Sequence, residues 1–285
     1  MIDPLVELRN PFSEAGLLRL AEPAGGFTVE QLAQLGDGTL GRPFLIDSGT
    51  LRHLLFATSS TQSIMRLDDP DALVTSYTRE MMAFLLFQPK PRHLLMIGLG
   101  GGCLAKFCYR HLKQARISVV EINAEVIALR ELFAIPADDE RLEVIHDDGA
   151  AFLAKTHVTP DVILIDAFDE LGVAPSLASA DFYRKASQSL TADGVLVMNL
   201  SGDVNRYPIH IEYLRAAFEG AVLLLPVAED GNLLLFAFKQ PGLAELPDFL
   251  QGRATDLEQG LSLEFPRFLE RLRAGPMQDT LQPCP

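Results

Sequence analysis

The sequence predicts an α/β fold built on a seven-stranded mixed sheet, and three observations lead to this prediction. From about residue 93 onward, short apolar runs alternate with amphipathic stretches, a pattern typical of βαβ units around a parallel sheet. A glycine-rich turn follows the first run directly, and acidic residues follow the next three runs. The last two runs are separated only by a short turn, which predicts an antiparallel hairpin at one edge of the sheet.

Seven runs of apolar residues are the expected strands. They are residues 93–97, 117–120, 142–145, 162–165, 195–198, 221–225 and 233–238. Apolar side chains at helical spacing predict the helices between them, as at Leu104, Phe107 and Cys108. The turn at residues 226–232 contains Glu229-Asp230-Gly231, which fits a hairpin between the last two strands.

The chain outside this pattern predicts two smaller parts. Residues 44–47 and 53–56 flank the turn cluster Ser48-Gly49-Thr50 and predict a small β-unit, and residues 71–87 predict a helix that prolines close. An amphipathic stretch at residues 268–272 predicts a peripheral C-terminal helix. We therefore expect an N-terminal region (1–70), a central α/β catalytic domain (71–240) and a C-terminal extension (241–285).

The composition argues against several classes of partner. The chain is 48% hydrophobic and carries a formal net charge of -14, so it can bury a core and is not drawn to nucleic acid or to anionic lipid, whereas a cationic substrate is attracted. No apolar run approaches the roughly 18 residues of a membrane helix, and the start of the chain does not resemble a signal peptide. We therefore expect a cytoplasmic protein with no membrane partner.

The cysteine and histidine pattern gives no reason to expect a metal. The three cysteines form no CxxC pair and the six histidines are scattered, so neither a structural zinc nor a metal cofactor is expected. Cys103 and Cys108 fit ordinary thiols in a reducing compartment.

The glycine turn predicts a nucleoside site. Gly98-Leu99-Gly100-Gly101-Gly102 lets backbone N–H groups and a helix N-terminus approach a ligand. Glu121 ends the next strand, near the spacing of about twenty residues expected for an acid that binds ribose hydroxyls. Asp148-Gly149 ends the third strand, where an acid can meet the adenine amino group. The nucleoside-binding candidates are Gly98, Gly100, Gly102, Glu121, Asp148 and Gly149.

This arrangement indicates a class I methyltransferase-like, Rossmann-like fold, in which ligands bind at the carboxyl ends of the strands. Two other interpretations of the glycine turn remain. It could be a tight strand-to-helix turn without a ligand, or it could bind a nicotinamide cofactor, although Cys103 occupies the place of the third glycine of that motif.

The fourth strand ends in an acidic loop with Asp166, Asp169 and Glu170. Clustered carboxylates repel one another unless a cation or hydrogen bonds relieve the repulsion, and a polyamine would do so. The alternative is a solvated loop in which an aspartate caps a helix.

The order of these motifs resembles the spermidine synthase (polyamine aminopropyltransferase) family, as a divergent member, over about residues 44–200. That family has a glycine turn, a ribose-binding Glu, a DG pair, a D-x-x-D loop and a helix with F-Y. The corresponding residues here are Gly98 to Gly102, Glu121, Asp148-Gly149, Asp166 to Asp169 and Phe182-Tyr183, and upstream Gln62-Ser63 and Glu80-Met81 are similar too.

The resemblance implies transfer of an aminopropyl group from decarboxylated S-adenosylmethionine to an amine, without a metal. Asp166 would take the proton of the attacking amine and Asp169 would orient the cationic chain. Gln62, Arg79 and Glu170 are the further substrate-site candidates, and we expect a homodimer.

The chain also departs from the family pattern. Gly101 stands where the family's turn has an Asp, Thr78 and Arg79 stand where its helix has Tyr and then His or Gln, and Glu170 replaces a Pro. Arg79 either points inward, where it could pair with a donor carboxylate, or lies on the solvent side of its helix. An S-adenosylmethionine-dependent methyltransferase and a catalytically silent nucleoside-binding module are therefore the alternative functions.

Overall fold

The computed structural model describes residues 5–9, 17–21, 28–58, 60–169 and 172–275. The chain divides into two compact units. The first unit comprises Met1–Val74, Gly100–Phe107 and Asn123–Ala137, and the second comprises Thr75–Leu99, Cys108–Ile122 and Asp138–Pro285. Our three-part division of the sequence stays a prediction. None of the helices that the structure describes has the length and apolar character needed to span a lipid bilayer.

The first unit contains a five-stranded antiparallel sheet in the order β1-β2-β3-β4-β5. Its strands are β1 (Leu5–Arg9), β2 (Leu17–Ala21), β3 (Phe44–Ser48), β4 (Leu51–Ala57) and β5 (Ser60–Arg66). Helix α1 (Val29–Asp37) lies against β4 and begins with a capping box formed by Thr28 and Gln31. The predicted β-unit is confirmed by β3 and β4, whereas the sequence analysis missed the other three strands.

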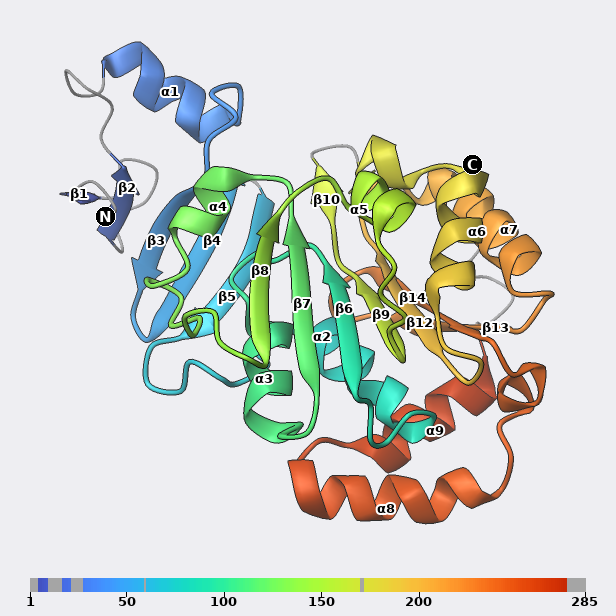
Figure 1. The fold of residues 1–285 in the computed structure, drawn as a ribbon. Helices are drawn as coiled ribbons and strands as arrows, with labels where there is room; N and C mark the ends of the chain where they lie inside the picture. Colours follow the sequence, from blue (N-terminus) through green and yellow to red (C-terminus); the bar gives the residue numbers. More distant parts are fainter. Residues whose placement is uncertain (1–4, 10–16, 22–27, 59, 170–171, 276–285) are drawn as a thin grey trace. The chain divides into compact units, whose positions relative to one another are not determined.

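The second unit contains the predicted seven-stranded mixed sheet, in the order β13-β14-β12-β9-β6-β7-β8 (Figure 1). Its strands are β6 (His93–Ile97), β7 (Arg116–Glu121), β8 (Leu142–His146), β9 (Val162–Ile165), β12 (Val195–Leu200), β13 (Val222–Val227) and β14 (Asn232–Phe238). Strands β8, β7, β6, β9 and β12 are parallel, and β14 pairs antiparallel with both β12 and β13. The α/β fold class and the edge hairpin are thereby confirmed.

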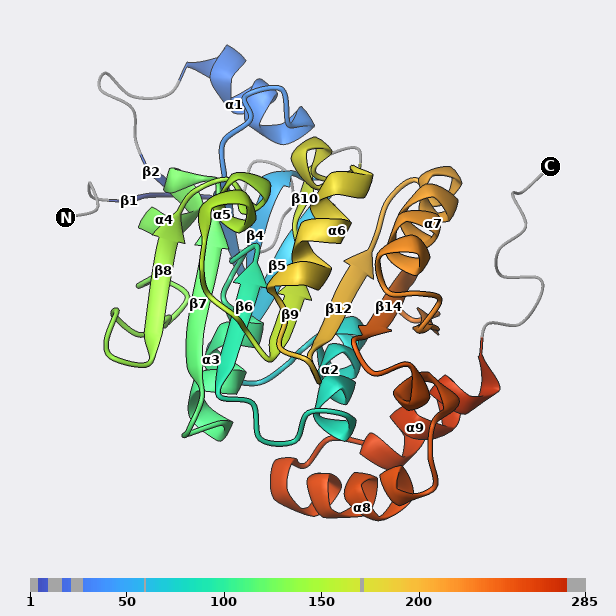
Figure 2. The same ribbon diagram turned by 45° about the vertical axis from the view of Figure 1, so that its right-hand side comes forward.

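Helices cover both faces of this sheet. On one face α5 (Gly149–Lys155), α6 (Ala180–Ser189) and α7 (Tyr207–Ala217) enclose a hydrophobic core, and Figures 1 and 2 show α6 and α7 side by side there. On the other face α2 (Ser76–Met81) lies against β12 and β14. Helices α3 (Cys103–His111) and α4 (Ala124–Ala128), the small hairpin β10 (Phe168–Asp169) and β11 (Gly172–Val173), and the 3-10 turns η2 (Pro175–Leu177), η3 (Val204–Arg206) and η4 (Pro241–Glu245) complete the connections.

The helix predicted for residues 71–87 is shorter than expected. It begins at Ser76, and after Met81 it tightens into the 3-10 segment η1 (Met82–Leu86). Every residue of η1 is buried, so this run is apolar on all sides rather than amphipathic. The carboxylate of Asp230 in the β13–β14 turn accepts a hydrogen bond from the Tyr77 N–H (2.6 Å), which satisfies one of the unpaired donors at the start of the helix.

The C-terminal extension forms two helices, α8 (Phe249–Leu261) and α9 (Phe265–Ala274), and both lie against η1. An ion pair between Arg271 of α9 and the buried Glu80 of α2 attaches this extension, and Arg271 also donates to the Pro226 carbonyl. Burial raises the pKa of Glu80 from 4.5 to about 7, and the positive charge of Arg271 opposes this rise. The ion pair therefore stabilises the ionised carboxylate in an apolar place.

We expect Arg271→Met to destabilise the protein more at high pH than at low pH. In the wild type the folded-state pKa of Glu80 lies above its unfolded value, so its contribution to stability is fully present below about pH 4.5 and is lost as the pH rises toward 7. Without Arg271 the folded-state pKa rises further. Breaking a buried pair in this way costs about 3 to 5 kcal/mol when the remaining charge is ionised.

Urea unfolding of wild type and variant at pH 5.5 and pH 8 measures this difference. The matched control is Arg273→Met, which changes an exposed arginine of the same helix. Equal destabilisation by Arg271→Met at the two pH values would show that the arginine acts through packing and its bond to the Pro226 carbonyl, and not through the charge of Glu80.

Candidate active site

The carboxyl ends of four parallel strands are tied together by backbone hydrogen bonds. These run from Gly98 N to Val120 O (2.9 Å), from Asp166 N to Ile97 O (2.9 Å) and from Asp147 N to Glu121 O (3.1 Å). The residues that follow β6, β7, β8 and β9 are therefore held at one edge of the sheet. Gly98 and the three acids predicted for the site, Glu121, Asp148 and Asp166, therefore all lie at this end of the parallel strands.

Two of these strands flank the point where the chain changes direction along the sheet. The chain moves from β6 to β7 and β8 on one side, and later to β9 and β12 on the other. Open α/β sheets bind their ligands at such a switch point, in the crevice outside the carboxyl ends of the strands. Gly98 and Asp166 follow the two strands that meet there.

Gly98 is required by a close approach between two backbone segments. Its φ is +98°, and a Cβ atom at this position would lie 2.1 Å from the Asp166 carbonyl oxygen. Gly149 is constrained as well, because its Cβ would lie 2.5 Å from Cγ2 of Ile97. Both glycines therefore have a packing role, and their contact with a nucleoside stays a prediction.

The Glu121 side chain holds the start of the glycine turn. It is 8% exposed, and its Oε2 accepts a hydrogen bond from the Leu99 N–H at 2.8 Å. A carboxylate has about four acceptor sites on its two oxygens, so Glu121 can accept from more than one donor. The predicted ribose contact is compatible with this arrangement and remains untested.

Asp148 caps a helix. Its Oδ1 accepts from the Ala151 N–H at 2.8 Å, which makes Asp148 the N-cap of α5. Asp147 forms an ion pair with Lys155 at 2.5 Å, so the first acid of this pair is also engaged. The structure thus gives Asp148 a structural role, and its predicted contact with adenine stays a prediction.

The rest of the glycine turn belongs to the first unit. Gly100 and Gly102 have φ values of +50° and +67°, which favour glycine. A Cβ at Gly101 would lie 2.7 Å from Ser63 Oγ and 2.9 Å from Phe133 Cδ1. An Asp at this place would require Ser63 and Phe133 to move, which is a physical reason why the chain has glycine here.

Asp166 is the acid of the D-x-x-D loop that the structure places in a hydrogen-bond network. Its Oδ1 accepts from Asn199 Nδ2 at 2.9 Å, and its Oδ2 accepts from the Tyr77 hydroxyl at 3.3 Å. Burial raises the pKa of Asp166, and the two hydrogen bonds oppose the rise because they stabilise the ionised form. A carboxyl whose pKa is raised by burial is a stronger base than an exposed aspartate.

Tyr77 was missed in the sequence analysis, which matched the tyrosine of the family's helix to Thr78. The structure instead buries Thr78, whose hydroxyl donates to the Thr75 carbonyl, and turns Tyr77 toward Asp166. Arg79 is half-buried and donates to Ser76 Oγ within the same helix. Asn199 was also not predicted. Its position in an otherwise apolar strand could have indicated it, because a buried amide needs a hydrogen-bond partner.

Three other site candidates are less defined. The backbone of Asp169 lies in β10 and pairs with Gly172 of β11. Glu170 lies outside the described residues. Gln62 lies in β5 of the first unit and is half-buried. Their predicted roles remain predictions. Among the residues that the structure describes, no group of three or more His, Cys, Asp or Glu side chains could hold a metal ion.

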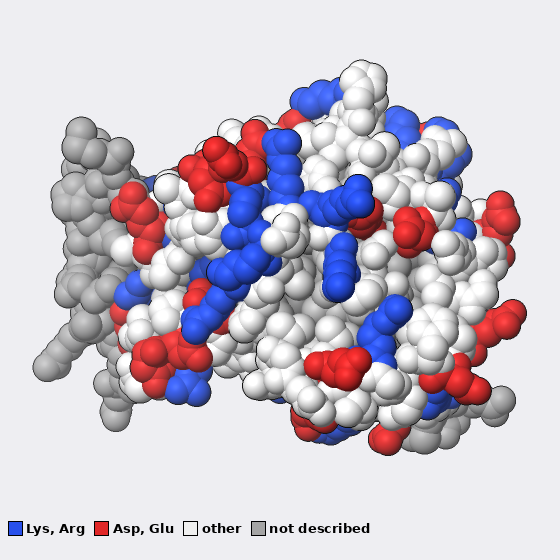
Figure 3. Space-filling model, turned by 60° about the horizontal axis from the view of Figure 1, so that its bottom comes forward, with Lys and Arg blue, Asp and Glu red and all other residues white. Residues whose placement is uncertain are grey.

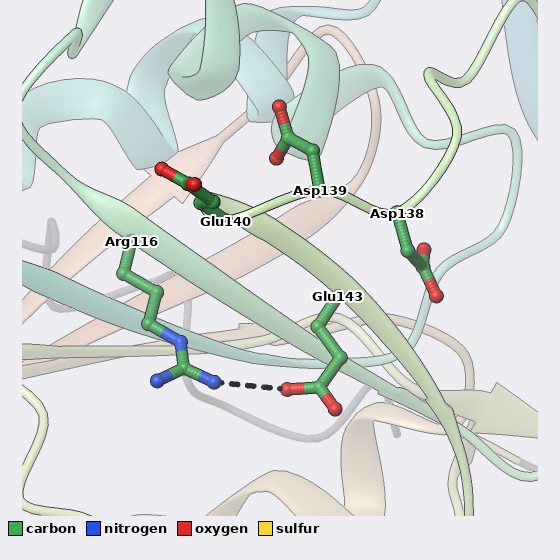
Figure 4. Close-up of a pocket in the computed structure, with 5 residues that line it drawn as sticks. All are labelled: Arg116, Asp138, Asp139, Glu140 and Glu143. Atoms are coloured by element: carbon green, nitrogen blue, oxygen red, sulfur yellow. Dashed lines mark hydrogen bonds and ion pairs between the residues drawn. The ribbon is translucent and has the colours of Figure 1, made fainter.

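A surface hollow lies at the amino ends of the parallel strands β7 and β8, opposite to the end that carries Asp166 (Figure 4). Arg116, Asp138, Asp139, Glu140 and Glu143 line it, and Arg116 pairs with Glu143 at 3.2 Å. The carboxylate of Asp139 accepts hydrogen bonds from the N–H groups of Arg141 and Leu142, so it fixes the local turn. Figure 3, which brings the lower side of Figure 1 forward, shows that this side of the molecule carries both blue and red side chains. This hollow has none of the residues that the family pattern requires.

The order of the strands and the turn at the switch point define a class I methyltransferase-like, Rossmann-like enzyme fold. Two solved structures agree with this class. Spermidine synthase from Thermotoga maritima superimposes with a TM-score of 0.64 at 19% identity, covering 84% of this chain and 83% of that one. Human methyltransferase-like protein 13 superimposes with a TM-score of 0.57 at 23% identity, covering 72% and 95%. Both likenesses establish the fold and nothing finer.

Sequence comparison identifies the family within this class. Residues 74–216 match the spermine/spermidine synthase domain. The polyamine aminopropyltransferase of Chromobacterium violaceum is 40% identical over 229 residues, which cover 80% of this chain and 87% of that protein. The chain belongs to the spermine/spermidine synthase family, a family of transferases, as the order of its motifs predicted.

We expect Glu121→Ala to weaken the binding of methylthioadenosine. Loss of hydrogen bonds to a charged acceptor costs about 1.5 to 3 kcal/mol per bond, equivalent to more than tenfold in affinity. Isothermal titration calorimetry with methylthioadenosine measures the effect. Glu143→Ala, at the amino end of the neighbouring strand β8, is the matched control and should bind as the wild type does. If Glu121→Ala also binds with wild-type affinity, Glu121 does not contact the ribose.

Proposed function

We propose that this protein is an aminopropyltransferase that moves an aminopropyl group from decarboxylated S-adenosylmethionine to an amine. The observation that carries the proposal is the placement of Asp166, which stands at the sheet's switch point with Tyr77 and Asn199 bonded to its two oxygens. Membership of the spermine/spermidine synthase family supports it. The match to a protein named polyamine aminopropyltransferase gives further support.

In the proposed reaction the acceptor nitrogen attacks the carbon beside the sulfonium of the donor. A C–N bond forms, the C–S bond breaks, and methylthioadenosine leaves with the electron pair on sulfur. The acceptor must be a neutral amine to attack, and the proton that it gives up goes to the Asp166 carboxylate. Burial raises the pKa of this carboxyl, which increases its strength as a base relative to an exposed aspartate.

Residues of the strand ends are proposed to hold the nucleoside part of the donor. Glu121 would accept the ribose hydroxyls, and the carboxylate of Asp148 would meet the adenine amino group. The full set proposed for the nucleoside is Gly98, Gly100, Gly102, Glu121, Asp148 and Gly149. The geometry of Glu121 supports this role because its other hydrogen bond fixes the turn that would pass beside the ligand.

The amine side of the site is proposed to consist of acids and one amide. Asp169 and Glu170 would attract the cationic part of the acceptor, and Gln62 would donate or accept a hydrogen bond from it. The formal net charge of -14 supports a cationic acceptor. We also propose that the protein acts as a homodimer in the cytoplasm, where its polyamine-related substrates would be available.

The identity of the donor depends on Gly101 and Arg79. Because Gly101 replaces an Asp, the site has one carboxylate fewer to repel the carboxylate of S-adenosylmethionine. The guanidinium of Arg79 donates to Ser76 Oγ, one turn earlier in the same helix α2, and this contact holds it against its own helix. This supports the decarboxylated donor as the substrate.

We expect Asp166→Asn to lower turnover by about a hundredfold or more, which is typical for loss of a general base. Nucleoside binding should be largely retained, because the substitution leaves the backbone beside Gly98 in place. Release of methylthioadenosine from decarboxylated S-adenosylmethionine, with a panel of amines as acceptors, measures turnover. Asp193→Asn changes an exposed loop aspartate and is the control. Full turnover by Asp166→Asn would remove this residue from the mechanism.

We further expect calorimetric titration to show tighter binding of decarboxylated S-adenosylmethionine than of S-adenosylmethionine. The reason is repulsion between the acidic loop and the donor carboxylate. Arg79→Ala should leave this preference unchanged if the guanidinium stays on its helix. The proposal would have to be replaced by a methyltransferase if S-adenosylmethionine bound more tightly and Arg79→Ala abolished that binding.

A further inference from the structure

The orientation of the Asn199 amide determines whether the ionised or the protonated carboxyl group of Asp166 is favoured. Asn199 is 2% exposed and stands near the carboxyl end of β12, one strand away from Asp166. Its Nδ2 lies 2.9 Å from Asp166 Oδ1. An ionised carboxylate has only acceptors, so the amide must present its NH2 group. A flipped amide would present its carbonyl oxygen, which a carboxyl group can meet only when it is protonated.

A second asparagine fixes this orientation from the other side. Asn232, the first residue of β14, is 9% exposed, and its Nδ2 lies 2.8 Å from Asn199 Oδ1. Donation from Asn232 occupies the carbonyl oxygen of Asn199 and thereby leaves the NH2 group facing Asp166. A flip of Asn199 alone would place two NH2 groups against each other, and the buried donors would lose their partners.

We propose that Asn232 is a positioning residue that locks the Asn199 amide and so holds the base Asp166 in its ionised, proton-accepting form. This rests on the proposed function of Asp166 as a base. Asn232 acts through Asn199 and not by touching the carboxylate. The side chains of three successive strands thus form a relay from Asn232 of β14 through Asn199 of β12 to Asp166 after β9.

The pairing of these strands sets the spacing of the relay. Strand β12 pairs with β9 in parallel, with Met198 opposite Ile165, and with β14 antiparallel, with Leu200 opposite Leu233. Asn199 and Asp166 each lie one residue beyond the Met198–Ile165 pair, and Asn232 lies one residue before Leu233. The register therefore brings all three residues to the same end of the strands. Strand pairing fixes the backbone positions of the three residues, and the hydrogen bonds between their side chains fix the orientation of the amides.

The same hairpin also supports the other hydrogen bond of Asp166. Asp230, two residues before Asn232, accepts from the Tyr77 N–H at the start of α2. Helix α2 then presents the Tyr77 hydroxyl to Asp166 Oδ2. Both side chains bonded to the base are therefore held by residues of the β13–β14 hairpin.

Substitution of Asn232 replaces none of the other groups that face Asp166, although Tyr77 also lowers the pKa of Asp166 through its hydrogen bond. Tyr77 is the titratable group that α2 presents to it, β12 and β14 present the neutral amides of Asn199 and Asn232, and β6 presents the backbone at Gly98. Asp230 carries a charge in the hairpin and is directed at the helix start. A change in the ionisation of Asp166 on substitution of Asn232 is therefore attributable to the relay.

Asn232→Leu tests the relay because leucine has a similar size and no donor. Without Asn232 the Asn199 carbonyl oxygen is left buried and unpaired, so the amide rotates and its bond to the carboxylate weakens. We expect the pKa of Asp166 to rise by about one unit or more, since a hydrogen bond to a charged group is worth at least that much. Turnover at a pH below the wild-type pKa of Asp166 should fall about tenfold for each unit of the shift.

The decisive measurement is a double-mutant cycle with Asn199→Leu. Asn199→Leu removes the bond to Asp166 directly, so it should raise the pKa on its own. Adding Asn232→Leu to this background should then change the pKa no further, because the intermediary is gone. A purely structural role for Asn232 would give the same shift in both backgrounds, and that result would overturn the proposal. Ala228→Leu, at an exposed position of the same hairpin, is the matched control and should leave the pKa unchanged.

Two readouts separate this proposal from the proposed function. The acid limb of the pH profile of kcat/KM reports Asp166 in the working enzyme, and carbon-13 NMR of the carboxyl group, assigned with Asp166→Asn, reports its ionisation without turnover. If no amine is aminopropylated but the NMR cycle is non-additive, the relay stands and the function fails. If Asp166→Asn is inactive but Asn232→Leu keeps the wild-type pKa, the function stands and the relay fails.

A measurement on the wild-type protein covers the case in which a leucine variant does not fold. The Asn199 side-chain NH2 signal in proton–nitrogen spectra should shift with the ionisation of Asp166, and the Asn232 NH2 group should exchange with solvent slowly. An Asn199 signal that ignores this ionisation, or an Asn232 group that exchanges as an exposed amide does, would contradict the relay.

Discussion

The close approach of the chain at Gly98 to the backbone of Asp166 is the constraint on which the site depends. Strands β6 and β9 are parallel neighbours with Ile97 opposite Ile165, so both chains leave the sheet at the same level. The Asp166 carbonyl oxygen then occupies the place where a Cβ of residue 98 would stand. Because only glycine tolerates this contact, Gly98 allows the glycine turn and the acidic loop to begin side by side at the carboxyl ends of the strands.

The polar groups at this edge combine structural and functional demands. Glu121 anchors the turn at Leu99, and Asp148 caps α5, so each acid has a structural partner before any ligand binds. If these residues bind the donor as proposed, such partners fix the side chains in advance and lower the entropy cost of binding. At Asp166 burial and hydrogen bonds oppose each other, so the pKa of its carboxyl is set by the balance between them.

The sequence alone determined the parts that depend on local pattern. The runs at residues 93–97 and 162–165 are strands with those same limits, and the family order of glycine turn, Glu121 and acidic loop predicted the family correctly. Apolar periodicity is a local signal, because a parallel strand buried on both faces needs a continuous apolar run. Turn chemistry is local too, since it depends on the φ values of a few residues.

Only the tertiary structure decided which side chains meet. An α-helix turns by about 100° per residue, so a shift of one position between Thr78 and Tyr77 moves the side chain from the interior to Asp166, and motif matching cannot resolve it. Asn199 and Asn232 are 33 positions apart, and their contact exists only because β12 and β14 pair in one register. Strand β5 was missed because its stabilising partner β4, rather than its own polar sequence, makes it a strand. Pairing across the sheet is set by packing of the whole core, which no local stretch of sequence encodes.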